Sequence, residues 1–342
     1  MEYDKTRLGT MDDIRAIYHA RPVVDIAKAQ RILDKHGLGR ATGLQPLGPY
    51  VTNFIHRIDR EELPPLVLKG QYRPTKTWDV RIEAEAIPLL RDGSDLPVPA
   101  TVVYDGDTDV LDHSYCLIDW LDGRSTLEVA KESPLDDRLT IAKQMGAVHR
   151  AIHDCPVPSG ADLPLADLRD WRRLTQDQLL AGDDFHRELQ QLCPAFEDIL
   201  NRGLEMARDT PSLRPPVLVW RDGSPGNTVC RVDNGGPRIC GVFDFQSAIV
   251  MQPTWDLIKA FNHYVPGSEP DRPPTPEWCA FCSGYGAEQP LDPAERCPFS
   301  VVGNAMHTRH WYESMGFLHP QTPAWLDGLL SSLGQLRLDT SG

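Results

Sequence analysis

The spacing of apolar residues predicts helices first, then short strands, in the first third of the chain. Residues 11–38 carry apolar positions at helical spacing. Thr10 followed by Asp13 resembles a helix start, and Gly37 is placed to stop the helix. Short apolar runs bounded by polar or proline-bearing segments then predict four strands, at residues 54–58, 66–69, 100–104 and 115–118. Between the second and third of these, residues 79–90 predict a helix that Pro88 bends or ends early.

After Gly123 the pattern becomes mainly helical. Helical spacing recurs in four segments, at residues 136–153, 170–208, 254–264 and most of 276–339. Residues 217–220 read as a strand, and residues 228–232 and 238–243 as a hairpin. The chain therefore divides into a β-rich lobe with N-terminal helices at 1–118, a connector at 119–123 and a helical lobe at 124–342.

Composition supports two lobes and narrows the class of partner. A chain of 342 residues with 41% hydrophobic content is too long for one core of the commonest size. Its net charge is −14 and it has no basic run, so nucleic acid and anionic membranes are poor partners. The polar N-terminus and the absence of an apolar stretch of about 20 residues lead us to expect a cytoplasmic protein without a membrane span.

The most informative stretch of the sequence holds two acids and an amide. Asp222 follows the strand at 217–220, and the Gly and Pro residues after it forbid a helix, so it lies on a tight loop. Asn227 begins the hairpin and Asp244 ends it, which places the two close together. An amide and a carboxylate held in this way suit a magnesium ion, whereas the alternative is that all three are ordinary turn and capping residues.

These residues resemble the aminoglycoside phosphotransferase-like kinases, a family that includes choline and homoserine kinases. Its members carry His-Gly-Asp, four residues and Asn, then a strand ending in Ile-Asp-Trp/Phe, then Asp-Pro-x-x-Asp-Leu. The matching segments are Trp220-Arg221-Asp222, Asn227, Val242-Phe243-Asp244-Phe245 and Gln252-Pro253-Thr254-Trp255-Asp256-Leu257. The resemblance covers about residues 40 to 265, with Trp220 and Arg221 in place of the usual His and Gly.

The resemblance implies a protein-kinase-like bilobal α+β fold and a role for each matching residue. Asp222 is expected to act as the catalytic base or to orient the attacking hydroxyl, and Asn227 and Asp244 to bind Mg²⁺. Asp256, together with Arg221, is expected to brace the catalytic loop. The cofactors implied are ATP or GTP with Mg²⁺.

The first lobe offers residues for the nucleotide. Lys69 stands in an apolar strand, where a lysine facing a cleft neutralises phosphates. Glu83 shares a helix face with Ile87 and Leu90, which makes it a better partner for Lys69 than Glu85. The alternative for the Lys69–Glu83 pair is a surface salt bridge that adds little to stability.

Two further nucleotide contacts follow from the resemblance. Gly48, Thr52 and Asn53 match the family's phosphate-covering turn, and residues 119–123 match its hinge. The carbonyl of Asp119 and the amide of Leu121 are then expected to bind the purine. One donor and one acceptor do not separate ATP from GTP.

Two histidine or cysteine patterns raise the question of a metal. Cys279-x-x-Cys282, with Cys297, His307 and His310 beyond it, lacks the second cysteine pair of common zinc sites, so we interpret these cysteines as buried thiols. His149 and His153 stand four apart on one helix, a spacing that can bind metal. We interpret them as packing residues, because the family places a Leu-His there.

The sequence therefore predicts a kinase that transfers the γ-phosphoryl group of a nucleotide to a hydroxyl of a small molecule. A sugar-containing antibiotic, of aminoglycoside or nucleoside type, is the best guess for the acceptor. The alternatives are a metabolic sugar, choline or amino-alcohol kinase, and an inactive nucleotide-binding module, which the exchanges at Trp220 and Arg221 suggest. Whether the protein is a monomer or a homodimer stays open.

Overall fold

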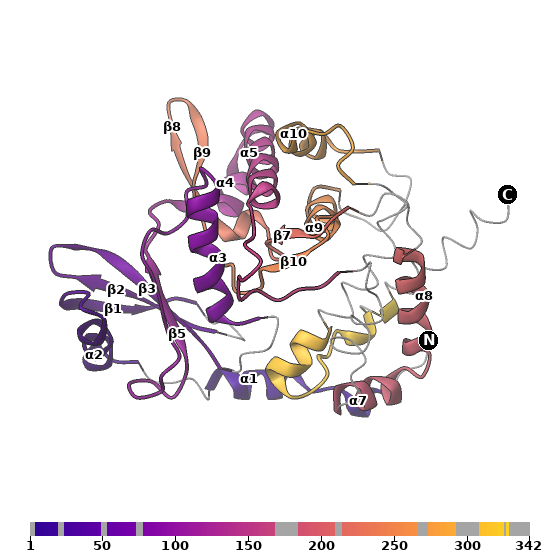
Figure 1. Cartoon of the computed structure of the whole chain (residues 1–342), viewed down its shortest axis with the longest axis horizontal. Coiled ribbons are helices and arrows are strands. Elements are labelled where there is room, and N and C mark those ends of the chain that lie inside the picture. The colour runs from indigo at the N-terminus through magenta and orange to yellow at the C-terminus, as the bar shows by residue number, and fades with distance from the viewer. Residues whose placement is uncertain are drawn as a thin grey trace.

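The chain folds into two parts, a smaller one built on a sheet and a larger one made mainly of helices (Figure 1). The computed structural model describes residues 4–19, 24–48, 53–72, 78–167, 184–208, 214–265, 273–291, 308–324 and 326–327. Helix α3 (Val80–Gly93) lies between the sheet and the helical part in this view. The predicted α+β fold with a β-rich and a helical lobe is confirmed.

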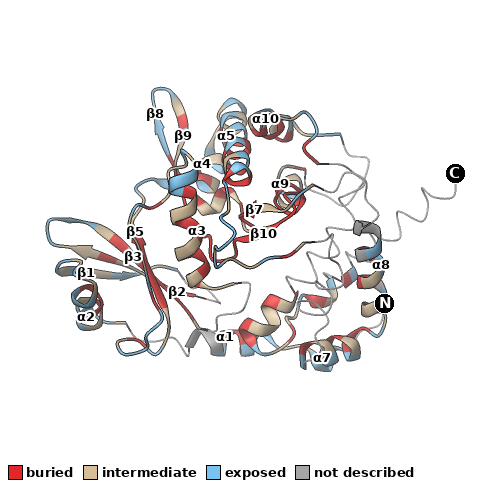
Figure 2. Cartoon of the chain, viewed as in Figure 1, coloured by how far each residue is buried: buried red, intermediate tan, exposed pale blue. Residues whose placement is uncertain are grey.

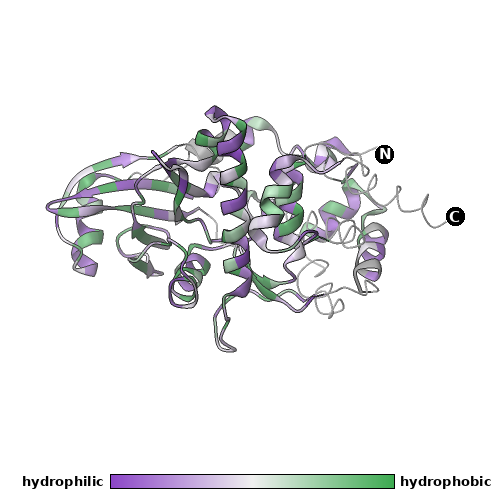
Figure 3. Cartoon of the chain, turned by 90° about the horizontal axis from the view of Figure 1, so that it is seen from above, coloured by the Kyte–Doolittle hydropathy of each residue, from purple (hydrophilic) through white to green (hydrophobic). Residues whose placement is uncertain are grey.

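The sheet of the smaller part is antiparallel, with strand order β1-β2-β3-β5-β4. Its strands are β1 (Ala41–Pro46), β2 (Asn53–Arg60), β3 (Leu63–Gln71), β4 (Val102–Asp105) and β5 (Tyr115–Asp119). Strand β1 was not predicted, because Gly43 and Pro46 interrupt its short apolar pattern. Figure 3 shows that polar and apolar residues both occur along the strands of the molecule.

The direction of successive side chains along β3 decides which face of the sheet Lys69 occupies. Leu66 and Leu68 are fully buried in a cluster with residues of helix α2 (Ile26–His36), on one face. Lys69, one position on, pairs in register with Cys116 of β5, and Cys116 belongs to the cluster that contains the apolar residues of α3. Because successive side chains point to opposite faces of a strand, Lys69 lies on the α3 face.

Helix α3 carries Glu83 to that same face, and of the two effects predicted for Pro88, a bend or an early end, the early end is wrong. Pro88 does not end the helix early, since α3 continues to Gly93. Proline removes one backbone donor, at a cost of about 3 kcal/mol in a helix interior. Burial of Ile87 and Leu90 in the main core offsets that cost.

The N-terminal segment forms two helices rather than the single one predicted. Helix α1 (Met11–His19) and helix α2 (Ile26–His36) are separate, and Asp25 caps α2 by accepting a hydrogen bond from the backbone of Lys28. Gly37 ends α2 in the left-handed conformation, with φ 64°, as predicted.

The first residues of the described chain lie against the larger part. A short 3-10 helix, η1 (Lys5–Arg7), is followed by Leu8, which forms a parallel bridge with Leu318. Arg7 also pairs with Glu188 at 3.5 Å. Residues 7 and 8 therefore contact the helical part before the chain enters the sheet.

The larger part packs its described helices around an apolar cluster (Figure 2). They are α4 (Thr126–Glu132), α5 (Leu135–Asp154), α7 (Asp184–Leu192), α8 (Phe196–Arg208), α9 (Thr254–Tyr264) and α10 (Pro276–Tyr285), with further helical residues at 308–315, 322–324 and 326–327. These confirm the predicted helices at 136–153 and 254–264, whereas residues 170–183 and 292–307 lie outside the described residues. None of the helices in these described ranges has both the length and the apolar character of a membrane span.

Two small sheets carry the loop with the acids. Strands β6 (Arg124–Ser125), β8 (Thr228–Asp233) and β9 (Gly236–Val242) form one, and β7 (Val217–Val219) and β10 (Ile249–Met251) form the other. Strands β8 and β9 are the predicted hairpin, and β7 is the predicted strand before Asp222. Between β7 and β8 runs a loop that ends in a single turn of 3-10 helix, η4 (Pro225–Asn227).

Helices α5 and α10 approach each other closely through glycine. A side chain on Gly146 of α5 would place its Cβ 2.0 Å from the carbonyl oxygen of Phe281 and 2.7 Å from the backbone nitrogen of Tyr285. Such contacts require the two helix backbones to move apart, so this helix pair depends on the absence of a side chain at position 146.

We predict that Gly146→Ala lowers the free energy of unfolding by about 1–3 kcal/mol or more, because the added methyl group overpacks this contact. Urea denaturation measures the change. Gly160→Ala is the matched control: no atom lies within 4 Å of its Cβ position, so its stability should stay the same or rise slightly. Equal effects of the two substitutions would contradict the account of helix packing.

Candidate active site

The ammonium group of Lys69 joins three elements by contacting two carboxylates. Its Nζ lies 2.6 Å from Oε2 of Glu83 on α3 and 2.7 Å from Oδ1 of Asp244, which follows β9. Lys69 and Glu83 are both buried. Burial opposes the charge of Lys69, but attraction from Asp244 and Glu83 raises its pKa, so the ammonium is charged. The Lys69–Glu83 pair is thus an interior ion pair and not a surface salt bridge.

The second oxygen of Glu83 holds the backbone around Asp244. Glu83 Oε1 accepts hydrogen bonds from the backbone N–H groups of Asp244, at 3.0 Å, and Phe245, at 3.2 Å. One buried carboxylate therefore fixes both the strand lysine and the segment that follows β9. Charged acceptors of this kind form stronger hydrogen bonds than neutral ones.

Asp244 has an unusual backbone and an unusual pKa. Its φ of 65° lies in the left-handed region, where a non-glycine residue needs support from its surroundings. The indole N–H of Trp220 supplies part of that support by donating to the Asp244 carbonyl at 2.9 Å. Burial raises the pKa of the Asp244 carboxyl to about 6, and the charges of Glu83 and Asp222 add to this against the opposing effect of Lys69. A divalent cation would relieve this excess of negative charge.

Asp222 and Asn227 face each other across the loop after β7. The amide nitrogen of Asn227 donates to the Asp222 carbonyl at 2.8 Å and lies 3.3 Å from the Asp222 carboxylate. The backbone carbonyl of Asn227 accepts from the N–H of Phe243 at 3.1 Å, which places Asn227 beside Asp244. The structure therefore brings together the acid, the amide and the second acid that the sequence singled out.

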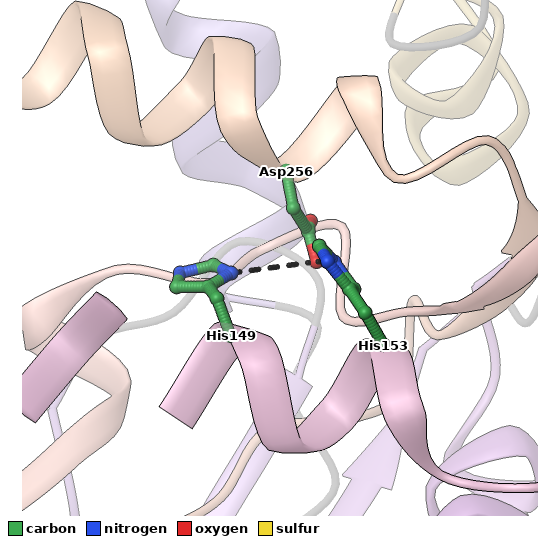
Figure 4. Close-up of side chains that lie close together, drawn as sticks. All are labelled: His149, His153 and Asp256. Carbon is green, nitrogen blue, oxygen red and sulfur yellow. Dashed lines mark hydrogen bonds and ion pairs between the residues drawn. The ribbon is translucent and has the colours of Figure 1, made fainter. Parts of the chain in front are cut away.

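Asp256 holds the backbone of the same loop from the side of α9. Its carboxylate accepts from the N–H groups of Trp220 at 2.8 Å and Arg221 at 2.7 Å. Two histidines of α5 flank it: His153 Nε2 lies 3.2 Å away and His149 Nδ1 3.6 Å away (Figure 4). Burial would raise the pKa of Asp256, but the histidines and their hydrogen bonding lower it, so the carboxylate is ionised.

His149, His153 and Asp256 are also close enough to share a metal ion. The contacts present explain the cluster as a brace for the loop. Burial lowers the pKa of His153, so its ring is neutral. A neutral ring with its proton on Nε2 donates to Asp256 and accepts at Nδ1 from the Tyr285 hydroxyl, 2.9 Å away. Both oxygens of Asp256 already accept backbone hydrogen bonds, which favours the packing interpretation of the two histidines.

Arg221 is buried between aromatic rings. Its guanidinium carbon lies 5.6 Å from the ring centre of Trp255 and 5.9 Å from that of Trp78, and its φ is 69°. Burial lowers the pKa of Arg221 to about 10, so it is charged at neutral pH. Trp78 in turn stacks on His310, with 4.0 Å between ring centres. Through Trp78, Arg221 thus ties the loop to the segment before α3 and to the helix at residues 308–315.

The residues expected at the nucleotide base and phosphates are placed as follows. Gly48 has a φ of 51°, a conformation that favours glycine, and Asn53 is buried at the start of β2, while Thr52 lies outside the described residues. The Asp119 carboxylate accepts from the backbone of Ala100 and Thr101. The side chain of Leu121 lies against Gly241 of β9, where an added Cβ would come within 2.9 Å of it.

The cysteine pattern of the last third does not gather in the described part of the chain. Cys282 is buried and Cys279 exposed, His310 stacks on Trp78, and Cys297 and His307 lie outside the described residues.

Comparison with known proteins identifies the family. A family model described as the phosphotransferase enzyme family matches residues 52–291, which is most of the chain and includes the Lys69–Glu83 ion pair and the loop that holds Asp222. The chain belongs to this family. It is a phosphotransferase, and the resemblance found in its motifs is confirmed. No curated protein matches it significantly.

Solved structures of this phosphotransferase fold match nearly the whole chain. The complex of APH(2")-IIia with GDP and kanamycin is 15% identical, with a TM-score of 0.58, and the match covers 93% of this chain and 99% of the other. The complex of APH(2")-IIa with gentamicin is 19% identical, with a TM-score of 0.62 and coverage of 91% and 96%. Macrolide 2'-phosphotransferase MphH from Brachybacterium faecium is 15% identical, with a TM-score of 0.54 and coverage of 88% and 97%. At these identities the likeness shows the fold.

Sequence reasoning missed three contributors to the site. Trp220 appeared as a departure from the family's His, but its indole N–H bonds the Asp244 carbonyl. Trp78 precedes α3 in a segment without a motif. Lys259 pairs with Asp222 at 2.9 Å. The sequence signal for this contact was its position on α9, three residues and about one turn after Asp256.

We predict that Trp220→Phe weakens magnesium-dependent nucleotide binding roughly tenfold. The substitution keeps the aromatic ring but removes the donor to the Asp244 carbonyl, a loss of about 1–2 kcal/mol. Isothermal titration calorimetry measures the affinity.

Trp278→Phe is the matched control, because Trp278 is also buried but stacks on Phe281 in the helical core. It should lower stability and leave nucleotide affinity unchanged. If both substitutions change affinity equally, the Trp220 indole has no specific role in the site.

Proposed function

We propose that this phosphotransferase moves the γ-phosphoryl group of ATP or GTP to a hydroxyl of a small molecule. The observation that carries the proposal is the meeting of Asp222, Asn227 and Asp244 beside the buried Lys69–Glu83 pair. In kinases, the protein positions the reactants and neutralises charge, and forms no covalent intermediate.

Each residue has a role that its surroundings support. The half-buried carboxylate of Asp222 accepts the proton of the attacking hydroxyl or orients that hydroxyl. Lys69 steadies the nucleotide phosphates, with its ammonium held in place by Glu83. Gly48, Thr52 and Asn53 cover the phosphates, and the backbone of Asp119 and Leu121 in the hinge, residues 119–123, receives the purine.

The residues around Asp244 fit a magnesium ion. Mg²⁺ prefers a few protein oxygens together with phosphates and water. The Asn227 amide nitrogen is fixed on Asp222, which leaves its side-chain oxygen for a cation, and Asp244 offers a carboxylate whose negative charge is incompletely balanced. When bound, the ion would neutralise the charge of the β- and γ-phosphates.

An antibiotic with a free hydroxyl is the proposed acceptor. The structures of this fold with kanamycin and gentamicin, and the macrolide 2'-phosphotransferase, are all antibiotic phosphotransferases by name. An aminoglycoside or nucleoside type remains the first choice, and a macrolide belongs in the same test. Sugar, choline and amino-alcohol acceptors represent the metabolic alternative.

We predict nucleotide-dependent phosphorylation of at least one antibiotic in a panel of aminoglycosides, nucleosides and macrolides. A coupled assay for release of the nucleoside diphosphate, run with ATP and with GTP and followed by mass spectrometry of the product, identifies the acceptor.

Asp222→Asn is the matched control, because it keeps the size of the side chain and removes its charge. It should lower turnover by a factor of about 10² or more and leave nucleotide binding largely intact. Turnover retained in Asp222→Asn would refute the role of Asp222. Phosphorylation of metabolic alcohols alone would replace the antibiotic by the metabolic alternative, and magnesium-dependent nucleotide binding without any acceptor would favour the inactive module.

A further inference from the structure

Lys259 of α9 lies against the carboxylate expected to receive the hydroxyl. Its Nζ is 2.9 Å from Oδ1 of Asp222, on the side opposite the Asn227 amide, which approaches Oδ2. Lys259 did not emerge from any motif, and the proposed function gives it no role.

The placement of Lys259 follows from a fixed contact of its helix. Asp256 binds the backbone of Trp220 and Arg221, which locks the first turn of α9 onto the catalytic loop. Lys259 stands three residues further along α9, so it lies on the same helix face. The helix that braces the loop therefore also delivers an ammonium group to the acid at the loop's centre.

Stability is a weak explanation for this pair. The side chains of Lys259 and Asp222 are 39% and 33% exposed, and ion pairs with such access to water contribute little to folding. The same exposure lets the ammonium shift when a substrate arrives.

The chemistry at Asp222 needs a cation that the loop itself does not supply. Residues 223–226 are Gly, Ser, Pro and Gly. Lys69 is held between Glu83 and Asp244, and Arg221 is buried between two tryptophan rings. Phosphoryl transfer places negative charge on the equatorial oxygens of the transferred group, next to the attacking hydroxyl.

We propose that Lys259 is a catalytic residue that contacts the phosphoryl group during transfer, a role that rests on the proposed function. The hydroxyl oxygen forms a bond to the γ-phosphorus. The bond from that phosphorus to the bridging oxygen breaks, and its electron pair leaves with the nucleoside diphosphate. The hydroxyl proton passes to Asp222. Lys259 stays protonated throughout and stabilises the charge on the transferred group.

The test compares the binding of two probes, a nucleoside diphosphate with magnesium and the same probe with aluminium fluoride, which mimics the group in transfer. ADP or GDP is used, whichever the wild type binds more tightly. Lys259→Met should weaken binding of the aluminium fluoride complex at least about tenfold and leave binding of the diphosphate alone unchanged. Lys259→Arg, which keeps the charge, should retain most of the extra affinity.

Lys143→Met controls for loss of an exposed lysine, because Lys143 lies on the exposed face of α5, and it should bind both probes as the wild type does. Equal affinity of Lys259→Met and wild type for the aluminium fluoride complex would overturn the inference and leave the proposed function standing. So would an equal loss for both probes, since Lys259 would then act on the nucleotide site or the fold. A wild type that binds neither probe would overturn the proposed function and this inference with it.

Discussion

The site depends on the contacts that the carboxylate of Glu83 makes. One oxygen holds the Lys69 ammonium of the sheet, and the other holds the backbone N–H groups of Asp244 and Phe245 in the larger part. Glu83 is fully buried, so its charge must be matched by these partners or cost several kcal/mol. The helix that carries Glu83 therefore fixes the position of Lys69, the proposed phosphate-neutralising residue, relative to the proposed metal ligand.

A second buried carboxylate, on α9, holds the backbone of the loop after β7. Asp256 accepts the N–H groups of Trp220 and Arg221, and Trp220 then donates to the Asp244 carbonyl. The two acids thus control the two left-handed residues of the site, Arg221 and Asp244. A protein gains little stability from such buried charges, but they define backbone positions that packing alone would leave variable.

Much of this could be predicted, because local patterns determine it. The strand position of Lys69 and the helix face that Glu83 occupies predict the Lys69–Glu83 pair. The hairpin predicts that Asn227 lies near Asp244. The rest depends on tertiary contacts. Trp220 stood out only as a departure from the usual His, because the sequence does not show that its indole N–H reaches the Asp244 carbonyl. The continuation of α3 past Pro88 depends on burial that no helix propensity records. Lys259 lies on a helix distant in sequence from the loop it contacts.

The central claim is that Glu83 couples the strand lysine to the segment proposed to bind the metal. The most direct measurement is the affinity of Glu83→Gln for ATP or GTP by calorimetry, with magnesium and with a chelator. The substitution preserves shape and removes the charge that pairs with Lys69. The account predicts that affinity in magnesium falls at least about tenfold and that the gain from magnesium is largely lost, while the protein still folds. A Glu83→Gln protein with the wild-type affinity and the wild-type response to magnesium would contradict it.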